Sequence, residues 1–250
     1  MIPIFRKIRK TLADDNKPLK YLRYAIGEIV LVVIGILIAL SINNWNENRK
    51  RQNEELFLLI DIKKNLETML MDFNSDTIYN SNGIVQYGKL EHYIANDLPY
   101  SNELDSVFGI LTFWSSPYIT ATAYNSLQNK GLDLIKNEEL KNNLIKLYEV
   151  ELQRLIEDYT ASENQLGNVV VEPYIVKKVK RLHNQSLRLA RPSDFESLKK
   201  DVEFTNILRH IIRQRKRGIE MYKDAMSKMK ISIDDIDKEL KKRKHNNDHN

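Results

Sequence analysis

Apolar and polar residues follow two different patterns along this chain. From Ala25 to Ile42 nearly every residue is apolar, and only Gly27, Glu28, Gly35 and Ser41 interrupt the run. Beyond that run, apolar residues recur every three or four positions, which is the spacing of one face of an α-helix. The first pattern predicts a helix that crosses a membrane, and the second predicts a series of amphipathic helices.

Two aromatic residues, Tyr24 and Trp45, flank the apolar run. At about 1.5 Å per residue they lie roughly 31 Å apart along a helix, which matches a hydrocarbon core of about 30 Å. The sequence therefore predicts a membrane anchor over residues 18–45, with Pro18 opening its helix. A cleaved signal peptide is the alternative, since Ala39-Leu40-Ser41 has small residues at the right spacing, but the run is long for such a peptide.

The chain beyond the anchor is expected to form a helical bundle over residues 46–244. The apolar stripe from Leu56 to Phe73 predicts that the anchor helix continues or restarts as an amphipathic helix. No segment has the alternating pattern of a β-strand, and residues 245–250 are expected to form a disordered tail. The fold class is therefore all-α, with an N-terminal transmembrane helix followed by a multi-helix antiparallel bundle. Further helical segments are expected: one that ends near Pro99, one over Leu104 to Phe113, one through Tyr124, one that starts at Glu138, one from Tyr174 to Leu189, and one after Ser193.

Several residues carry the signals of helix ends. Gly131 is expected at the C-terminal end of one helix, where a positive φ is favourable, and Asn137 is expected to cap the next. Pro173 marks a helix boundary. Ser193 begins a capping-box pattern, and Ser232 has the flanking residues of another helix start.

The net charge of +5 is concentrated near the anchor. Seven basic residues and three acidic ones lie within residues 1–45. Residues 1–17 are therefore expected to form a basic cytoplasmic segment, either an amphipathic helix from Ile2 to Leu12 on an anionic leaflet or a charged flank that only sets topology. The positive-inside tendency places the bulk of the chain in the periplasm, anchored in the inner membrane, although Arg49, Lys50 and Arg51 follow the run.

The remaining charge is divided unevenly between the two halves of the bundle. Residues 46–172 hold 11 basic and 20 acidic residues, whereas residues 173–250 hold 21 and 11. One interpretation of this uneven distribution is that the two halves pack together and neutralise each other's charge. The other is that the second half presents a basic surface to an anionic partner. Nucleic acid is an unlikely partner, because the overall basicity comes mainly from the membrane flank. The candidate anionic-partner surface consists of Arg209, Arg213, Arg215, Lys216 and Arg217. A solvated helix face with internal ion pairs is the alternative interpretation of the same residues.

The anchor itself holds two candidate contact features. Glu28 is the one ionisable residue in the apolar run, and it lies within about one turn of the expected cytoplasmic interface. It is expected to contact headgroups or Arg23 there or, alternatively, to make a polar contact with a partner helix. Gly35 and Ala39 form a small-xxx-small pair that allows two anchor helices to approach closely, so a homo-oligomer is one possible assembly.

No catalytic or cofactor motif is present in the sequence. The chain has no cysteine, which excludes disulfides, thiolate catalysis and Cys-ligated zinc. Its five histidines belong to no metal-binding motif, and no phosphate-binding loop or nucleophile elbow is found. We therefore expect no cofactor, no metal site and no enzyme activity. A hydrolase with a site built from scattered carboxylates and His92, His183 or His210 is the alternative.

The segment YAIGEIVLVVIGILIALSINNWNE, residues 24–47, together with the preceding FRKIR at residues 5–9, resembles an uncharacterised family of small single-pass membrane proteins from Bacteroidota-type bacteria. A weaker similarity covers Ala123 to Leu140. The resemblance implies an N-terminal anchor followed by a helical domain of unknown function, and it supplies no catalytic residues.

These observations favour a membrane-anchored helical module that acts by binding, as a scaffold or partner module. An envelope hydrolase with an unrecognised site is one alternative. A basic tether for anionic polymers or lipids is the other. The lipid bilayer and a protein partner, or a second copy of the chain, are the expected partners.

Overall fold

The computed structural model describes residues 18–182 and 188–248, and its described side chains are those of residues 22, 25–182 and 188–243. The expected cytoplasmic segment, residues 1–17, lies outside the described residues. The chain divides into two compact units, residues 1–55 and 56–250.

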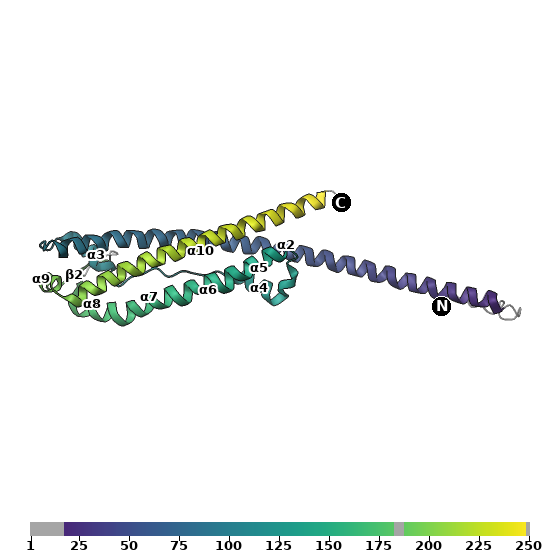
Figure 1. The fold of residues 1–250 in the computed structure, drawn as a ribbon, viewed down its shortest axis with the longest axis horizontal. Coiled ribbons are helices and arrows are strands. Elements are labelled where there is room, and N and C mark those ends of the chain that lie inside the picture. Colours follow the sequence, from purple (N-terminus) through teal and green to yellow (C-terminus); the bar gives the residue numbers. More distant parts are fainter. Residues whose placement is uncertain (1–17, 183–187, 249–250) are drawn as a thin grey trace. The chain divides into compact units, whose positions relative to one another are not determined.

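One helix, α2 (Pro18–Ala95), contains both the apolar run and the amphipathic stripe (Figure 1). The helix therefore continues beyond Trp45 and does not restart there. It ends at Ala95, Asp97 in the following turn has a φ of 51°, and Pro99 comes shortly after. A proline close to a helix end prevents the helix from resuming.

The second unit is built on three long helical segments: α2 from Leu56 onward, the run from Glu138 to Lys178, and α10 (Val202–Asp248). The all-α fold is thus confirmed. Each of two apolar cores contains residues from all three segments. The order in which a segment passes through the two cores gives the direction of that segment. α2 and the Glu138–Lys178 run point the same way, and α10 is antiparallel to both.

The remaining elements are short, and most of them connect these long segments. In chain order they are the 3₁₀ helix Asn102–Leu104, α3 (Asp105–Ile110), α4 (Thr122–Lys130) and the 3₁₀ helix Leu132–Leu134. α5 (Glu138–Lys146), α6 (Leu152–Arg154), α7 (Ala161–Gln165) and α8 (Glu172–Lys178) make up the second long run, separated by π-helical turns at Leu147–Glu151, Leu155–Thr160 and Leu166–Val171. β1 (Val179–Arg181), β2 (Ala190–Pro192) and α9 (Phe195–Lys199) lead into α10.

We call the two clusters of buried apolar side chains the first core and the second core. The first core joins Leu59 to Phe73 of α2 with Leu140 to Tyr159 and with Tyr222 to Ile236. The second core joins Tyr87 and Leu90 of α2 with residues of α3, the end of the Glu138–Lys178 run, α9 and the start of α10. Burying a large apolar side chain contributes about 1.5–3 kcal/mol, so these two cores supply the main driving force for the bundle.

The expected helix from Tyr174 to Leu189 is wrong after Lys178. The chain forms a two-stranded antiparallel sheet in which Val179 faces Pro192 and Arg181 faces Ala190. The sheet lies against α3 at Gly109, where an added Cβ would stand 1.6 Å from the carbonyl oxygen of Arg188. Only glycine permits this approach, and such a long-range contact leaves no local signal in the sequence.

Pro173 marks the start of α8, but the helical run does not break there. It lies in the first turn of α8, directly after a π-helical turn, where the missing N–H of proline is tolerated. Ser232 is not a helix start, because it is buried within the uninterrupted α10. That helix continues to Asp248, beyond Lys244, where the bundle was expected to end.

The other expected helix ends are close to those observed. Gly131 follows α4 with a φ of 102°, and the side chain of Asn137 accepts a hydrogen bond from the backbone N–H of Leu140. The expected cap at Ser193 is displaced by one residue. Asp194 fills that role, accepting a hydrogen bond from the backbone N–H of Ser197, because its carboxylate occupies the N-cap position of α9.

Candidate functional site

A buried ion pair lies between the two apolar cores. Arg215 of α10 contacts Glu163 of α7, and their side chains are 3% and 2% exposed. Arg215 also donates a hydrogen bond to the backbone oxygen of Phe113 at 3.1 Å. Removing two opposite charges from water costs several kcal/mol per ion, and the attraction between them roughly compensates for it.

Further polar side chains surround this pair. Asn80 of α2 donates a hydrogen bond to the hydroxyl of Tyr159 at 3.3 Å, and Gln214 donates one to the hydroxyl of Ser162 at 2.8 Å. Of the eight buried polar or charged residues in the described part of the chain, four lie here. We call the group Asn80, Tyr159, Glu163, Gln214 and Arg215 the polar layer.

The polar layer separates the cores on all three long segments. On α2, Asn80 follows the last first-core residue, Phe73, and precedes Tyr87 of the second core. Glu163 holds the corresponding place on the second run, as Arg215 does on α10. A buried layer of this kind penalises any axial shift of one helix, since a shift would place a charge against apolar side chains.

Burial changes the acidity of the groups in and around this layer. It raises the pKa of the Tyr159 hydroxyl, and it raises the pKa of the nearby Tyr87 to about 12. The pKa of Asp76 is also raised by burial, although the hydroxyl of Ser115 donates a hydrogen bond to its carboxylate. The hydroxyls of Tyr159 and Tyr87 therefore stay protonated at neutral pH and act as hydrogen-bonding groups.

Gly218 allows the helices to approach closely at this level. A Cβ at Gly218 would lie 2.3 Å from the ring of Tyr159. The aromatic ring of Tyr159 in turn packs edge-on against Tyr222, with ring centroids 5.7 Å apart. Together the glycine and the π-helical turn at Leu155–Thr160 place the Tyr159 hydroxyl within reach of Asn80.

The five residues of the candidate anionic-partner surface do not form one surface. Arg215 is buried, and it belongs to the polar layer. Arg209 lies 3.6 Å from Glu91, and Arg217 lies 3.8 Å from Asp158. The remaining two residues, Arg213 and Lys216, are exposed.

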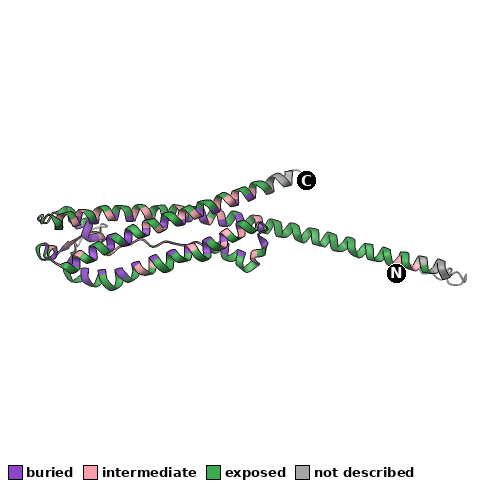
Figure 2. Cartoon of the chain, in the orientation of Figure 1, coloured by how far each residue is buried: buried purple, intermediate pink, exposed green. Residues whose placement is uncertain are grey.

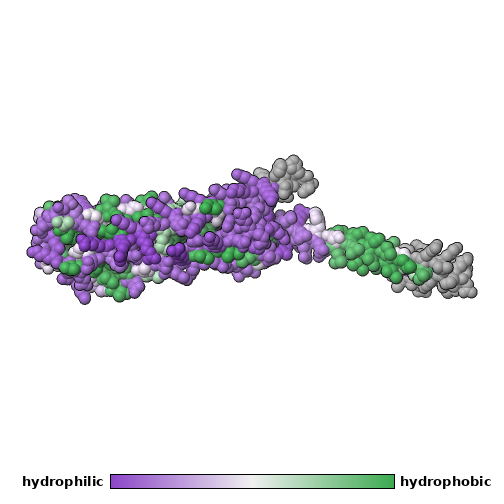
Figure 3. Space-filling model, in the orientation of Figure 1, coloured by the Kyte–Doolittle hydropathy of each residue, from purple (hydrophilic) through white to green (hydrophobic). Residues whose placement is uncertain are grey.

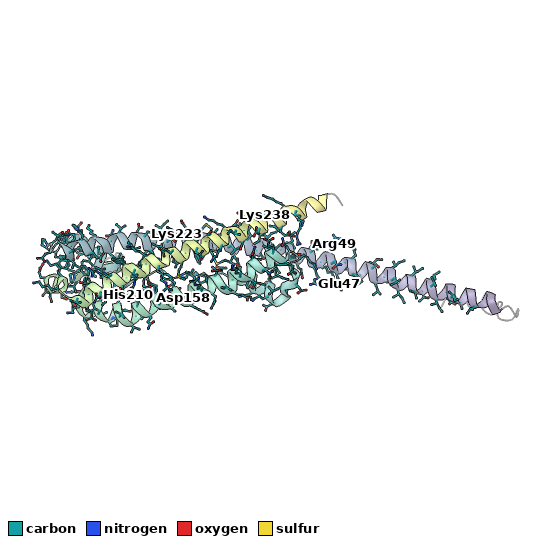
Figure 4. All side chains as sticks on the ribbon, viewed as in Figure 1. Glu47, Arg49, Asp158, His210, Lys223 and Lys238 are labelled. Atoms are coloured by element: carbon teal, nitrogen blue, oxygen red, sulfur yellow. The ribbon has the colours of Figure 1, made fainter. Side chains whose placement is uncertain are left out.

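The two described histidines considered for a hydrolase, His92 and His210, have different neighbours. His210, labelled in Figure 4, lines a cleft of about 490 Å³ with Glu203, Asn206 and four apolar residues. Burial, together with the charge of Arg213, lowers the pKa of His210. His92 contacts Asn96 in the turn directly after α2, and His183 lies outside the described residues. The described part of the chain contains no group of three or more His, Asp or Glu side chains that could hold a metal ion.

The apolar run of α2 is exposed from Ile29 to Ile42. One helix in the described residues is long and apolar enough to cross a membrane by length and composition, and none of its most apolar window is buried within the chain. Figure 2 shows this part of the helix as exposed, and Figure 3 shows hydrophobic surface gathered over it. The guanidinium of Arg49 lies 5.9 Å from the ring centroid of Trp45.

The other anchor residues are placed along the same helix. Glu28 is partly exposed, and Gly35 and Ala39 are exposed. A Cβ added at Gly35 would meet no described atom within 4 Å, so packing within the chain does not require this glycine. Tyr24 lies in α2, but its side chain is outside the described part.

A family of unknown function (DUF6090) matches residues 28–92, which all lie within α2. The match includes most of the anchor segment that carries the resemblance and extends beyond it, but it does not reach Ala123 to Leu140. No curated protein and no solved structure matches the chain.

Proposed function

We propose that this protein is a single-pass membrane protein whose helical bundle lies outside the cytoplasm and acts by binding, as a scaffold or partner module. The observation that carries the proposal is the exposed apolar window of α2, none of which is buried within the chain. An exposed apolar surface of that size is unfavourable in water and favourable in a bilayer. The basic residues before the run favour a cytoplasmic N-terminal flank in the inner membrane.

The arrangement of the bundle supports binding over the two alternatives. The buried charges Glu163 and Arg215 contact each other, and the cleft beside His210 holds one histidine and one carboxylate, Glu203. A tether for anionic polymers would use free cations, yet Arg209 and Arg217 lie close to carboxylates of other helices. The same proximity to carboxylates argues against nucleic acid as a partner.

Membrane retention and topology test this proposal. Alkaline phosphatase and, separately, a fluorescent protein would be fused after Asn250 and expressed in a bacterial host. We expect an active phosphatase and a dark fluorescent fusion in carbonate-washed membranes. An inactive phosphatase with a bright fluorescent fusion would overturn the orientation, and recovery of the chain in the soluble fraction would overturn the anchor.

A matched pair of variants makes the retention test specific. Leu31→Arg with Ile38→Arg places two charges in the apolar window, each unfavourable by about 2.5–3.5 kcal/mol at the centre of a membrane helix. We expect this variant to leave the membrane. Val150→Arg with Val169→Arg adds the same charges at exposed apolar positions of the bundle and is expected to remain bound.

Homo-oligomerisation through the anchor is a separate part of the proposal. Replacing Gly35 and Ala39 with leucine removes the small surface by which two anchors approach. A fall in chemically crosslinked dimer supports this contact, and an unchanged yield excludes it.

A further inference from the structure

The exposed face of α2 in the second unit carries apolar residues at intervals of seven. Phe57, Met71, Ile78 and Val85 share this spacing, with Lys64 at the remaining position. Met71, Ile78 and Val85 are 64%, 53% and 70% exposed. A two-stranded coiled coil repeats its apolar contacts every seven residues, and these residues fill one of the two apolar positions of their heptads. We call these five positions the α2 stripe.

The surface beside the stripe lacks charge over much of its length. Between Met71 and Gly88, Asp72 is the one charged residue among the exposed positions, although charged residues make up 29% of the chain. The exposed face of α10 from Arg209 to Glu220 is, by contrast, mostly charged. Depletion of charge distinguishes the centres of protein interfaces from solvated surface. The other exposed residues beside the stripe in this stretch are Asn74, Ser75, Ser81, Asn82 and Gly88.

Gly88 adds an independent observation. It is exposed, and a Cβ added there would meet no described atom within 4 Å. Glycine in a helix interior is less favourable than alanine by about 1 kcal/mol. Packing within the chain does not account for this glycine, whereas close approach by another backbone does.

From these features we propose that the α2 stripe binds the α2 stripe of a second copy of this chain, in parallel. The inference rests on the proposed function, because anchoring in one bilayer favours the parallel orientation. In a two-fold pairing Met71, Ile78 and Val85 each meet their own counterparts. The pairing is therefore self-complementary, and no other protein is required.

Charge complementarity at the start of the stripe supports a second copy as the partner. Asp61, Lys64 and Glu67 are exposed at intervals of three residues, with alternating sign. In the parallel pair Lys64 of one copy meets Lys64 of the other, and Asp61 and Glu67 of both copies, three residues away on either side, supply the compensating negative charge. Glu67 also lies 3.7 Å from Lys63 of its own chain, an exposed contact that leaves the carboxylate accessible. A single lysine within an apolar stripe fixes the register at some loss of stability.

The size of the contact indicates that it depends on the anchor. The stripe is about 42 Å long at 1.5 Å per residue, so a strip about 10 Å wide covers roughly 400 Å² on each copy. Stable interfaces in solution bury about 1,200–2,000 Å² in total. The pairing is therefore weak between free bundles, and holding two copies in one membrane raises their effective concentration.

Cysteine crosslinking tests the pairing directly, because the chain has no cysteine of its own. Met71→Cys, Ile78→Cys and Val85→Cys would be introduced one at a time into the full chain in membranes and oxidised with copper phenanthroline. Lys223→Cys, an exposed position of α10, and Val150→Cys serve as controls. We expect at least tenfold more disulfide-linked dimer at the stripe positions. Equal yields at stripe and control positions would overturn the proposal.

A second set of variants tests whether the stripe itself drives association. In the Met71→Cys background, Ile78→Glu with Val85→Glu is expected to lower the dimer yield at least tenfold, because two carboxylates per copy would face each other. Val169→Glu with Val176→Glu adds the same charges at exposed valines of the second run, and the yield is expected to stay within twofold. Circular dichroism would confirm that both variants remain helical. An unchanged yield in the stripe variant would contradict the proposal.

The two proposals fail in different ways. An inactive phosphatase fusion or a soluble chain would count against the proposed function. An active fusion and a membrane-bound chain that gives no dimer at any of the three stripe positions would count against the stripe alone.

Discussion

Leu66 of the first core and Glu163 of the polar layer are buried to nearly the same extent, at 0% and 2% exposure, but they stabilise the bundle differently. Leu66 leaves water at a gain and needs no specific partner. Glu163 leaves water at a loss, which Arg215 compensates only when the two helices are in register. The cores therefore provide stability, and the polar layer, as a hypothesis for this protein, specifies how the three helices align.

The strongest test of this difference is to remove one charge of the pair. Glu163→Ala leaves Arg215 buried without its carboxylate, and we expect a loss of about 3–5 kcal/mol in the free energy of unfolding. The measurement is denaturant unfolding of the full chain in mild detergent, followed by circular dichroism. Glu157→Ala, at an exposed position of the same run, is the control and is expected to change stability by less than about 0.5 kcal/mol.

Removing both charges distinguishes specificity from stability. Glu163→Leu with Arg215→Met replaces the pair by apolar residues, and such replacements are neutral or stabilising by about 1–4 kcal/mol. If the double variant is as unstable as Glu163→Ala, the pair contributes stability itself and the comparison with the cores is wrong.

Gly218 and Gly88 differ in their surroundings, and their substitutions are expected to change stability in opposite directions and by smaller amounts. Gly218→Ala would force the ring of Tyr159 to move, since the new Cβ would lie 2.3 Å from it. We expect a loss of about 1–3 kcal/mol, typical of overpacking. Gly88→Ala meets open space and is expected to raise stability by about 0.5–1 kcal/mol in dilute, detergent-solubilised protein. A stability change of the same sign in both variants would contradict the packing described here.

Much of the fold was predictable because its signals are local. The apolar run, the amphipathic stripes and the caps at Gly131 and Asn137 depend on residues close together in the sequence. The β1–β2 sheet was not predictable, since it depends on Gly109 accepting the Arg188 backbone across the fold. The continuous helix through Ser232 was missed because burial in the bundle outweighs a local capping pattern.

The polar layer was also missed, although one signal for it was present. Arg215 follows Ile211 and Ile212 by four and three residues, and so occupies an apolar position of the α10 stripe. A charged residue on that face indicates a buried partner. The sequence could not identify the partner, because Glu163 lies more than 50 residues earlier and is one of many carboxylates.

An ion pair at the rim of the second core extends the comparison to pH. Arg191 donates hydrogen bonds to Asp105, and this contact holds the pKa of the Asp105 carboxyl below its usual range. The stability that the pair contributes is therefore fully present above the unfolded-state pKa near 3.8 and is lost as the pH falls through the lower folded-state value. Arg191 is 43% exposed, so we expect at most about 1 kcal/mol, well below the effect at Glu163.

The measurement for this pair is the denaturation midpoint between pH 2 and pH 7. Asp105→Asn should flatten the acid limb of that curve relative to the parent chain. Glu172→Gln, at an exposed position of α8, should leave the limb unchanged. A limb that is equally steep in Asp105→Asn would assign the acid sensitivity to other carboxylates.

The smallest effect is expected on the outer face of α10, two residues from the buried pair. Arg213→Ala and Lys216→Ala remove exposed charges on either side of Arg215, and each should change the free energy of unfolding by less than about 0.5 kcal/mol. Arg215→Ala should be several kcal/mol less stable than either, because it leaves Glu163 buried without its cation. Equal losses at the three positions would contradict the distinction between the buried Arg215 and its exposed neighbours. A loss confined to Arg215 would show that this residue stabilises the bundle from within, whereas the neighbouring charges of Arg213 and Lys216 are solvated.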